Sequence, residues 1–363
     1  MNIIESAKER QTGVDLYKIL CCFLITTIHL FGYSDFLSIK ELTTANFIVA
    51  GIISSANIIG TSGFVFISGY YLSGKGTNVN LKRIMSFILE INFLSVFIFF
   101  ISFLLKHNFS LSLVIHSFFP LLTQHFWYPF NYVVLLLLSP YLNLFIEKIS
   151  KKELFCFILI IVSVSCGFLK LDIFYSSYVF LGHSSHSFLW WIILYITAAY
   201  YRRYGVNHPT LYGPVLFLTC IIIGFLIISA KRYNIMQNEV ELLDDNSLLG
   251  LLATYSSFIT FRRINIGFGH KLSSVMKYLV PATFVVYIFQ EHNSIRNSLW
   301  SFVNVSKYAQ APFYKLIILI LLLFIGLWIL SVVIYLTYLL ARKLYVDRIC
   351  HLIEKIIKNI IHN

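Results

Sequence analysis

The chain has 363 residues, of which 58% are hydrophobic and only 12% are charged, and its mean hydropathy is +0.79. This balance excludes a soluble globular protein of this length and indicates a polytopic membrane protein. The formal net charge is +12. In a membrane protein we attribute that charge to loops facing anionic lipid and to an anionic ligand, and not to nucleic acid.

Apolar segments follow one another along nearly the whole chain, separated by short polar stretches. A span needs about 20 residues, so they predict an all-α bundle of about ten transmembrane helices. We expect residues 1–341 to form this bundle as a single domain. The segments cover residues 14–33, 46–72, 84–106, 127–146, 154–170, 186–201, 211–230, 247–261, 276–291 and 313–341.

The Lys and Arg residues predict how the bundle is oriented. With the N-terminus inside, most of the 28 basic residues fall in segments that would face the cytoplasm, which favours both termini in the cytoplasm. The first apolar run has no small-residue cleavage site, so we expect it to stay in the plasma membrane as a span of a multi-pass protein. Residues 342–363 alternate Ile and Leu with Lys and Arg, which predicts a cytoplasmic amphipathic tail helix lying on the inner surface.

The first segment, VDLYKILCCFLITTIHLF, carries two ionisable side chains, Lys18 and His29. They are eleven positions apart, which on an α-helix is about three turns and about 16 Å, so both lie on nearly the same face. Ionisable groups inside a span usually face a cavity or a partner, which makes both residues candidates for a site. The structural alternatives also stay open: Lys18 would extend to the membrane surface, and His29 would pack against a neighbouring helix.

A basic pair, Lys82 and Arg83, stands at the predicted cytoplasmic start of the third segment. It satisfies the positive-inside rule, and it would equally suit the phosphates of a nucleotide-like molecule. Glu90 lies about two turns deeper, where it would pair with Lys18 or an arginine, or act as a functional carboxylate.

The fourth segment opens with the sequence HFWYPFN, which places Trp127, Tyr128 and Asn131 near the predicted outer surface. The two aromatic residues would belong to the aromatic belt at the membrane surface, or they would stack on a sugar ring. Pro140, further along, frees backbone groups that must be satisfied inside the protein, so we expect the inner half of this helix to line the bundle.

The ninth segment ends in TFVVYIFQEHNSIR, which gathers Gln290, Glu291 and Arg296 at the predicted outer surface. Such a cluster would bind a polar acceptor or form an ordinary charged loop. His183 and His186 are three positions apart, but no third ligand accompanies them, so we predict no metal site.

Taken in order, these motifs resemble the acyltransferase 3 family, the bacterial integral-membrane O-acyltransferases of the polysaccharide O-acetylase type. The first span carries the acidic, basic and histidine positions of the family as Asp15, Lys18 and His29. The sequence SGYYL ends the second segment, Lys82 and Arg83 follow it, and WYPFNYVVLLLLSPYLN opens the fourth segment.

Three positions depart from the family pattern. Lys18 stands where the family commonly has Arg, and Ser86 stands where the third arginine of the cytoplasmic motif is expected. Gln290 replaces the histidine that commonly ends the ninth span. Lys18 keeps the positive charge but loses the planar guanidinium fork, and the role of position 290 is open.

The resemblance implies a reaction. Acetyl-CoA, or another acyl-CoA, would approach from the cytoplasm as donor, its phosphates held by Lys18, Lys82 and Arg83. His29 would act as general base on the acceptor hydroxyl, for which an unperturbed pKa of about 6.5 is suitable, or take part in relaying the acyl group across the membrane. Asp15 would orient or hold a partner. The acceptor would be a hydroxyl of an envelope or capsular polysaccharide, or of a lipid-linked saccharide. The residues assigned to it are Trp127, Tyr128, Asn131 and Glu291.

Two functions of other classes compete with the enzyme. One is a transporter or flippase of lipid-linked saccharides, which repeated, discontinuous halves would favour; no such repeat is visible. The other is a scaffold or signalling protein in which Lys18, Glu90 and His29 only fix helix packing. An enzyme predicts that Lys18, the Lys82–Arg83 pair and His29 converge on one cavity, whereas a His29 facing lipid would argue against it.

Overall fold

The structure is a computed structural model that describes residues 11–106, 110–166, 187–205, 208–235, 243–266 and 270–349. Every regular element in these ranges is a helix, and none of these residues forms a strand. The predicted all-α class is therefore confirmed. The apolar composition explains the helices, because a helix satisfies its own backbone N–H and C=O groups where no water is available.

Six helical stretches are long and apolar enough to cross a membrane, which makes the chain a multi-pass membrane protein. Several other helices fall short of the usual span length, namely α7 (Lys151–Cys166), α9 (Phe188–Tyr204) and α11 (Leu248–Arg262). The total of ten spans and the cytoplasmic termini therefore stay predictions. The six stretches are Thr12–Gly32, Thr44–Leu72, Leu81–Leu105, Trp127–Lys148, Tyr212–Arg232 and Phe313–Ile349.

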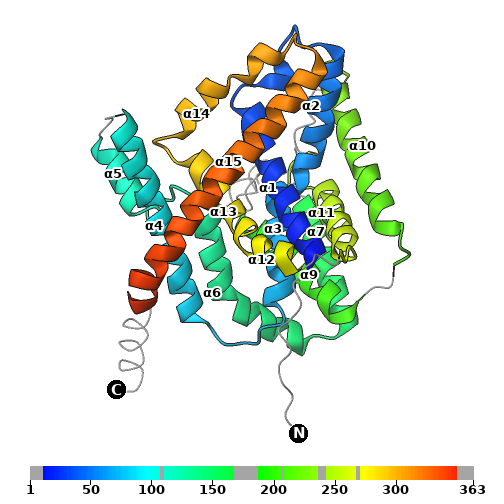
Figure 1. Cartoon of the computed structure of the whole chain (residues 1–363). Helices are drawn as coiled ribbons and strands as arrows, with labels where there is room; N and C mark the ends of the chain where they lie inside the picture. Colours follow the sequence, from blue (N-terminus) through cyan, green and yellow to red (C-terminus); the bar gives the residue numbers. More distant parts are fainter. Residues whose placement is uncertain are drawn as a thin grey trace.

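Helix α1 (Thr12–Gly32) occupies the centre of the bundle (Figure 1). It packs against α3 (Gly60–Leu72), α11 and α13 (Ala282–Glu291). Of the residues in its most apolar stretch, 61% are buried, against 17% for α10 (Tyr212–Arg232) at the periphery. We call the end of the bundle at which α1 begins the lower end and the opposite one the upper end, as drawn in Figure 1.

Close packing around α1 depends on small residues in α3. A Cβ atom on Gly63 would come within 2.5 Å of the Cys21 Sγ, and one on Gly69 within 2.7 Å of the Tyr195 Cα in α9. Glycine at these two positions lets α3 lie directly against both neighbours, as is usual between membrane helices. Helix α2 (Thr44–Ala56) joins α3 through the single turn η2 (Asn57–Ile59).

Helix α4 (Leu81–Lys106) rises from the lower end, and α6 (Trp127–Lys148) returns toward it after the short α5 (Leu111–Phe118) (Figure 1). The lower half of α6 faces the bundle, as Pro140 predicted. Asn143 is buried there, donates to the carbonyl oxygens of Leu72 (3.1 Å) and Gly76 (2.7 Å), and accepts from the Tyr195 hydroxyl (2.6 Å).

The last long helix, α15 (Phe313–Ala341), runs from the upper to the lower end across the front of the molecule in Figure 1. It continues into the π-helical turn η7 (Arg342–Val346). Most of the predicted tail helix, from residue 350 on, lies outside the described residues. The remaining elements are η1 (Phe36–Ser38), α12 (His270–Leu279), α14 (Arg296–Val303) and η6 (Val305–Tyr308).

Candidate active site

A cavity of about 380 Å³ lies inside the bundle, between α1, α3, α4, α6 and α13. Helix α1 contributes Lys18, Cys22 and Ile25 to its wall. These residues follow each other at four and three positions, the spacing that places side chains on one face of a helix. His29 is the next position in this series, one turn above Ile25, so the face that lines the cavity leads directly to it.

Helix α13 supplies a second stripe of the same kind, formed by Thr283, Tyr287 and Gln290. Gln290 is completely buried at the upper end of the cavity. Glu291 follows it and turns toward α1. The two helices are in contact, so their stripes face one space and both lead to the same upper end.

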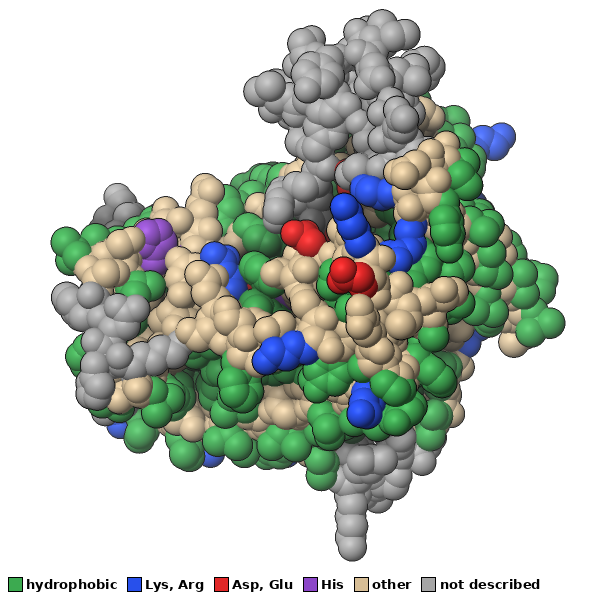
Figure 2. All heavy atoms as spheres, turned by 90° about the horizontal axis from the view of Figure 1, so that it is seen from above, with side chains coloured by type: hydrophobic (Ala, Val, Ile, Leu, Met, Phe, Trp, Pro, Cys, Tyr) green, Lys and Arg blue, Asp and Glu red, His purple; other side chains and the backbone are tan. Residues whose placement is uncertain are grey.

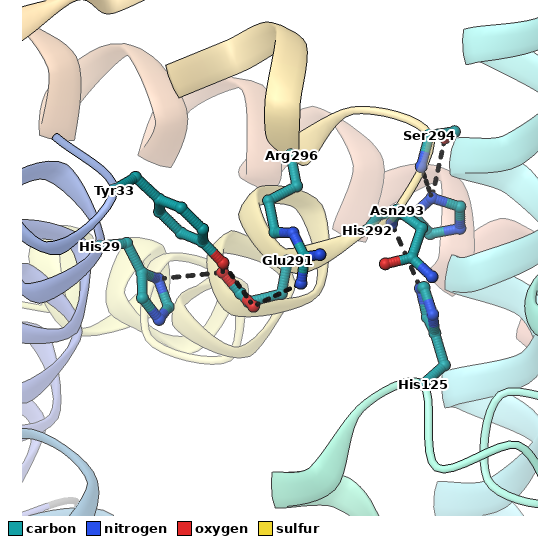
Figure 3. Close-up of polar contacts among 8 residues, drawn as sticks. All are labelled: His29, Tyr33, His125, Glu291, His292, Asn293, Ser294 and Arg296. Carbon is teal, nitrogen blue, oxygen red and sulfur yellow. Dashed lines mark hydrogen bonds and ion pairs between the residues drawn. The ribbon is translucent and has the colours of Figure 1, made fainter. Parts of the chain in front are cut away.

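His29 and Glu291 meet just above the cavity (Figure 3). The His29 Nδ1 lies 3.4 Å from the Glu291 Oε1, an ion-pair distance, and the other ring nitrogen points away from the carboxylate (Figure 3). The imidazole packs against the rings of Tyr33 and Trp300 and is mostly buried, so it faces protein and not lipid. A carboxylate at this place orients the ring and stabilises it once it takes up a proton.

Two further groups hold the Glu291 carboxylate. Arg296 lies 3.6 Å from its Oε2, and the Tyr33 hydroxyl donates to its Oε1 at 3.2 Å. Burial, followed by the charge of Glu291, raises the pKa of Tyr33 to about 12, so its hydroxyl keeps the proton that it donates. Glu291 therefore lies at ion-pair distance from His29 and is itself held by Arg296 and Tyr33.

The lower end of the cavity is basic. Lys18 lies 3.8 Å from Asp15, and Arg83 donates to the Tyr132 hydroxyl at 3.3 Å. Arg83 also lines a second pocket of about 460 Å³ with Lys82, Glu90 and Arg342. The two pockets adjoin because they share Arg83 and two aromatic residues. Cations therefore stand on the path from the lower surface into the cavity.

The predicted site residues divide between these places. Trp127 and Tyr128 line the cavity, where the Tyr128 ring lies 4.9 Å from that of Trp191. Asn131 is not among the residues that line it. Glu90 faces Arg342 in the second pocket, which supports its predicted pairing with an arginine over pairing with Lys18.

A second histidine group lies on the other side of the α13 terminus (Figure 3). His292 is completely buried, its Nδ1 lies 2.8 Å from the Ser294 hydroxyl, and its Nε2 lies 3.3 Å from that of Ser95. The His125 ring lies 5.1 Å from it. Among the described residues, no three His, Cys, Asp or Glu side chains form a group that could hold a metal ion; His183 and His186 are outside those residues.

The upper face also carries a further pocket, of about 810 Å³, beside the end of α1. Basic and acidic side chains gather on this face in Figure 2, and the pocket is lined by Asp35, Lys40, Arg232 and Asp245 among others. Arg232 donates hydrogen bonds to the carbonyl oxygens of Leu37 and Leu42. His29 does not line this pocket.

The sequence did not indicate that Glu291 is the partner of His29, or that Arg342 joins Lys82 and Arg83. The usable signal for Glu291 was its place: it ends one helix near the level at which His29 ends another. For Arg342 there was none, because 259 positions separate it from Arg83 (342 minus 83).

Residues 11–337 match the family model of acyltransferase 3, described as an acyltransferase domain. The match covers nearly the whole chain, including every residue of the cavity and of the His29–Glu291 pair. No curated protein and no solved structure matches the chain.

Proposed function

The chain belongs to the acyltransferase 3 family, and on that premise we propose that it transfers an acetyl group from cytoplasmic acetyl-CoA to a hydroxyl of an envelope or capsular polysaccharide. One observation carries the proposal. Lys18 and Arg83 line the lower part of one cavity, and a mostly buried His–Glu pair lies just above its upper end. A donor with phosphates at one end and a reactive thioester at the other fits this polarity.

The lower end binds the donor in this proposal. Lys82, Arg83 and Lys18 hold the phosphates, and Arg342 adds a cation where Ser86 stands in place of the third arginine of the family motif. Asp15 keeps Lys18 in position. The distribution of basic residues along the chain supports a cytoplasmic location for this end.

The upper end performs the chemistry. The pantetheine arm extends between the two stripes and brings the thioester to Gln290. The ring nitrogen of His29 that points away from Glu291 takes the proton of the acceptor hydroxyl, whose oxygen attacks the acyl carbon. Glu291 stabilises the imidazolium, and the proton is then available for the departing CoA sulfur.

Aromatic side chains support a saccharide acceptor. Trp127 and Tyr128 present rings to the cavity, and Tyr33 and Trp300 stack on each other beside His29 at 5.7 Å. Such faces suit the apolar faces of sugar rings, and Arg296 and Glu291 offer hydrogen bonds to hydroxyl groups. A lipid-linked saccharide would reach the same place from the membrane.

The test follows labelled acetyl groups from acetyl-CoA into envelope material of membranes that contain equal amounts of the wild type or the His29→Ala variant. We expect incorporation with the wild type and a loss of at least about 100-fold with the variant, the range of an acid–base group. His116→Ala, which removes a histidine near the surface of α5, is the matched control and should retain activity.

Each result has a distinct meaning. If the wild type transfers no more label than membranes without the protein, across polysaccharide and lipid-linked acceptors, the enzyme is excluded and transport of lipid-linked saccharides takes its place. If His29→Ala and the wild type are equally active, the family activity stands but His29 is not the base.

A further inference from the structure

The side chain of Gln290 is fully buried, and neither its Oε1 nor its Nε2 has a hydrogen-bond partner in the part of the chain that the structure describes. The same side chain lines the cavity. An amide buried without partners destabilises a folded protein, whereas Met or Leu would fill the same volume without that penalty. An amide at this place therefore points to a partner that enters through the cavity.

Gln290 also stands between the cavity and the base. It shares its helix face with Thr283 and Tyr287, which line the cavity, and it precedes Glu291, which holds His29. The amide lies near the His29 ring, but no hydrogen bond joins the two side chains. A group bound to the amide thus lies beside His29, and both polar atoms of Gln290 are available for it.

We propose that Gln290 is a catalytic residue whose Nε2–H donates a hydrogen bond to the carbonyl oxygen of the acyl thioester. The inference rests on the proposed function and deepens it. The hydrogen bond holds the carbonyl carbon next to His29 and strengthens when that oxygen becomes negative. Donors placed where an oxyanion forms are among the largest contributions to acyl transfer.

The reaction balances with the groups already named. The acceptor oxygen forms a bond to the carbonyl carbon while its proton moves to His29, and the carbonyl π electrons move to the oxygen that faces Gln290. When this tetrahedral intermediate collapses, the C=O bond reforms and the C–S bond breaks. The CoA sulfur takes the electron pair and receives the proton from His29, which leaves an ester and free CoA.

The test compares the wild type with Gln290→Met and Gln290→Glu, purified in detergent. Met keeps the length without polar atoms, and Glu keeps an acceptor but removes both N–H donors. We expect kcat with saturating acetyl-CoA to fall about 100- to 1000-fold in both variants, while the Kd of unacylated CoA, which has no acyl carbonyl, stays unchanged. Gln290→Met should also unfold at the same or a higher temperature than the wild type, because it removes two unpartnered polar atoms.

Ser331→Ala is the matched control. The Ser331 hydroxyl is also buried without a partner, but it lies in α15 and does not line the cavity, so kcat should stay at the wild-type value. Gln290→Met with kcat within about threefold of the wild type would overturn the inference, and with His29→Ala inactive it would leave the proposed function intact. A Gln290→Met variant that loses thermal stability and CoA binding together would also overturn it, because that is the signature of a structural residue. Absence of acetyl transfer by the wild type would instead overturn the proposed function.

Discussion

Glu291 and His292 are consecutive in the chain, yet their side chains leave the end of α13 in opposite directions (Figure 3). Glu291 enters a charged group in which His29 and Arg296 both lie within 3.6 Å of its oxygens. His292 enters a group of serine hydroxyls and another histidine, where no carboxylate pairs with it among the described residues.

The two sides differ in what they do with charge. On the His292 side, burial lowers the pKa of His292 to about 4 and that of His125 to about 3, so both rings are neutral at physiological pH and serve as hydrogen-bonding core residues. On the Glu291 side, a carboxylate stands ready to stabilise a protonated imidazole. Counter-charge, and not the presence of histidine, therefore marks the side that suits proton transfer.

Removal of the Glu291 charge should have the largest effect, on kcat. In Glu291→Gln the amide keeps the shape but cannot stabilise the His29 imidazolium, so we expect kcat to fall about 100-fold. Initial rates of acetyl transfer at saturating acetyl-CoA measure it. Glu153→Gln, which removes an exposed carboxylate near Ser150, is the control, and a kcat of Glu291→Gln equal to that of the control would refute the pairing.

The basic lower end should affect donor binding and leave the chemistry intact. We expect Lys82→Ala and Arg83→Ala each to raise the KM for acetyl-CoA about tenfold, corresponding to about 1.4 kcal/mol, with little change in kcat. The difference from wild type should shrink at high salt, because ions screen exposed charges. Lys152→Ala, at an exposed site on α7, controls for net charge, and an equal rise in its KM would remove the specific role of the pair.

His292 should affect stability far more than activity. His292→Ala leaves the Ser95 and Ser294 hydroxyls without their ring partner, which we expect to lower the free energy of unfolding by about 1–3 kcal/mol. Thermal unfolding in detergent measures this, and kcat below the unfolding temperature should stay near that of the wild type. A catalytic loss as large as that of His29→Ala, in protein that is still folded, would erase the distinction between the two sides.

The smallest expected effect is a loss of thermal stability in mild acid. The folded pKa of His125 is about 3, below the unfolded value of about 6.5, because burial and then the neighbouring His292 and His116 disfavour its charged form. The unfolded state therefore binds more protons below pH 6.5. The stability that the neutral His125 ring gives the folded protein is complete above that pH and is lost progressively as the pH falls toward 3.

The unfolding temperature of the wild type should accordingly drop by a few degrees more between pH 7 and pH 5 than that of His125→Asn, which has nothing to titrate. Burial also lowers the pKa of His292, to about 4, so the unfolding temperature of the double variant His125→Asn/His292→Asn should depend on pH even less. Parallel curves for the wild type and both variants would show that these rings are not buried in their neutral form.

The sequence alone determined the class of the protein and indicated part of its candidate site. Composition and segment length decided an all-α membrane bundle, because hydrocarbon allows only self-satisfied helices or closed barrels. The spacing of Lys18 and His29 placed both on one helix face, because α-helical geometry is local.

Only the tertiary structure decided which partners those faces meet. Glu291 lies 262 positions from His29 (291 minus 29), and nothing in local periodicity links them; the contact of α1 with α13 does. The same contact buries Gln290 at the end of the cavity and turns His292 away from it. A helix fixes the direction of each side chain relative to its own axis, but the rotation of that axis in the bundle is set by packing, and this rotation separates a catalytic candidate from a core residue.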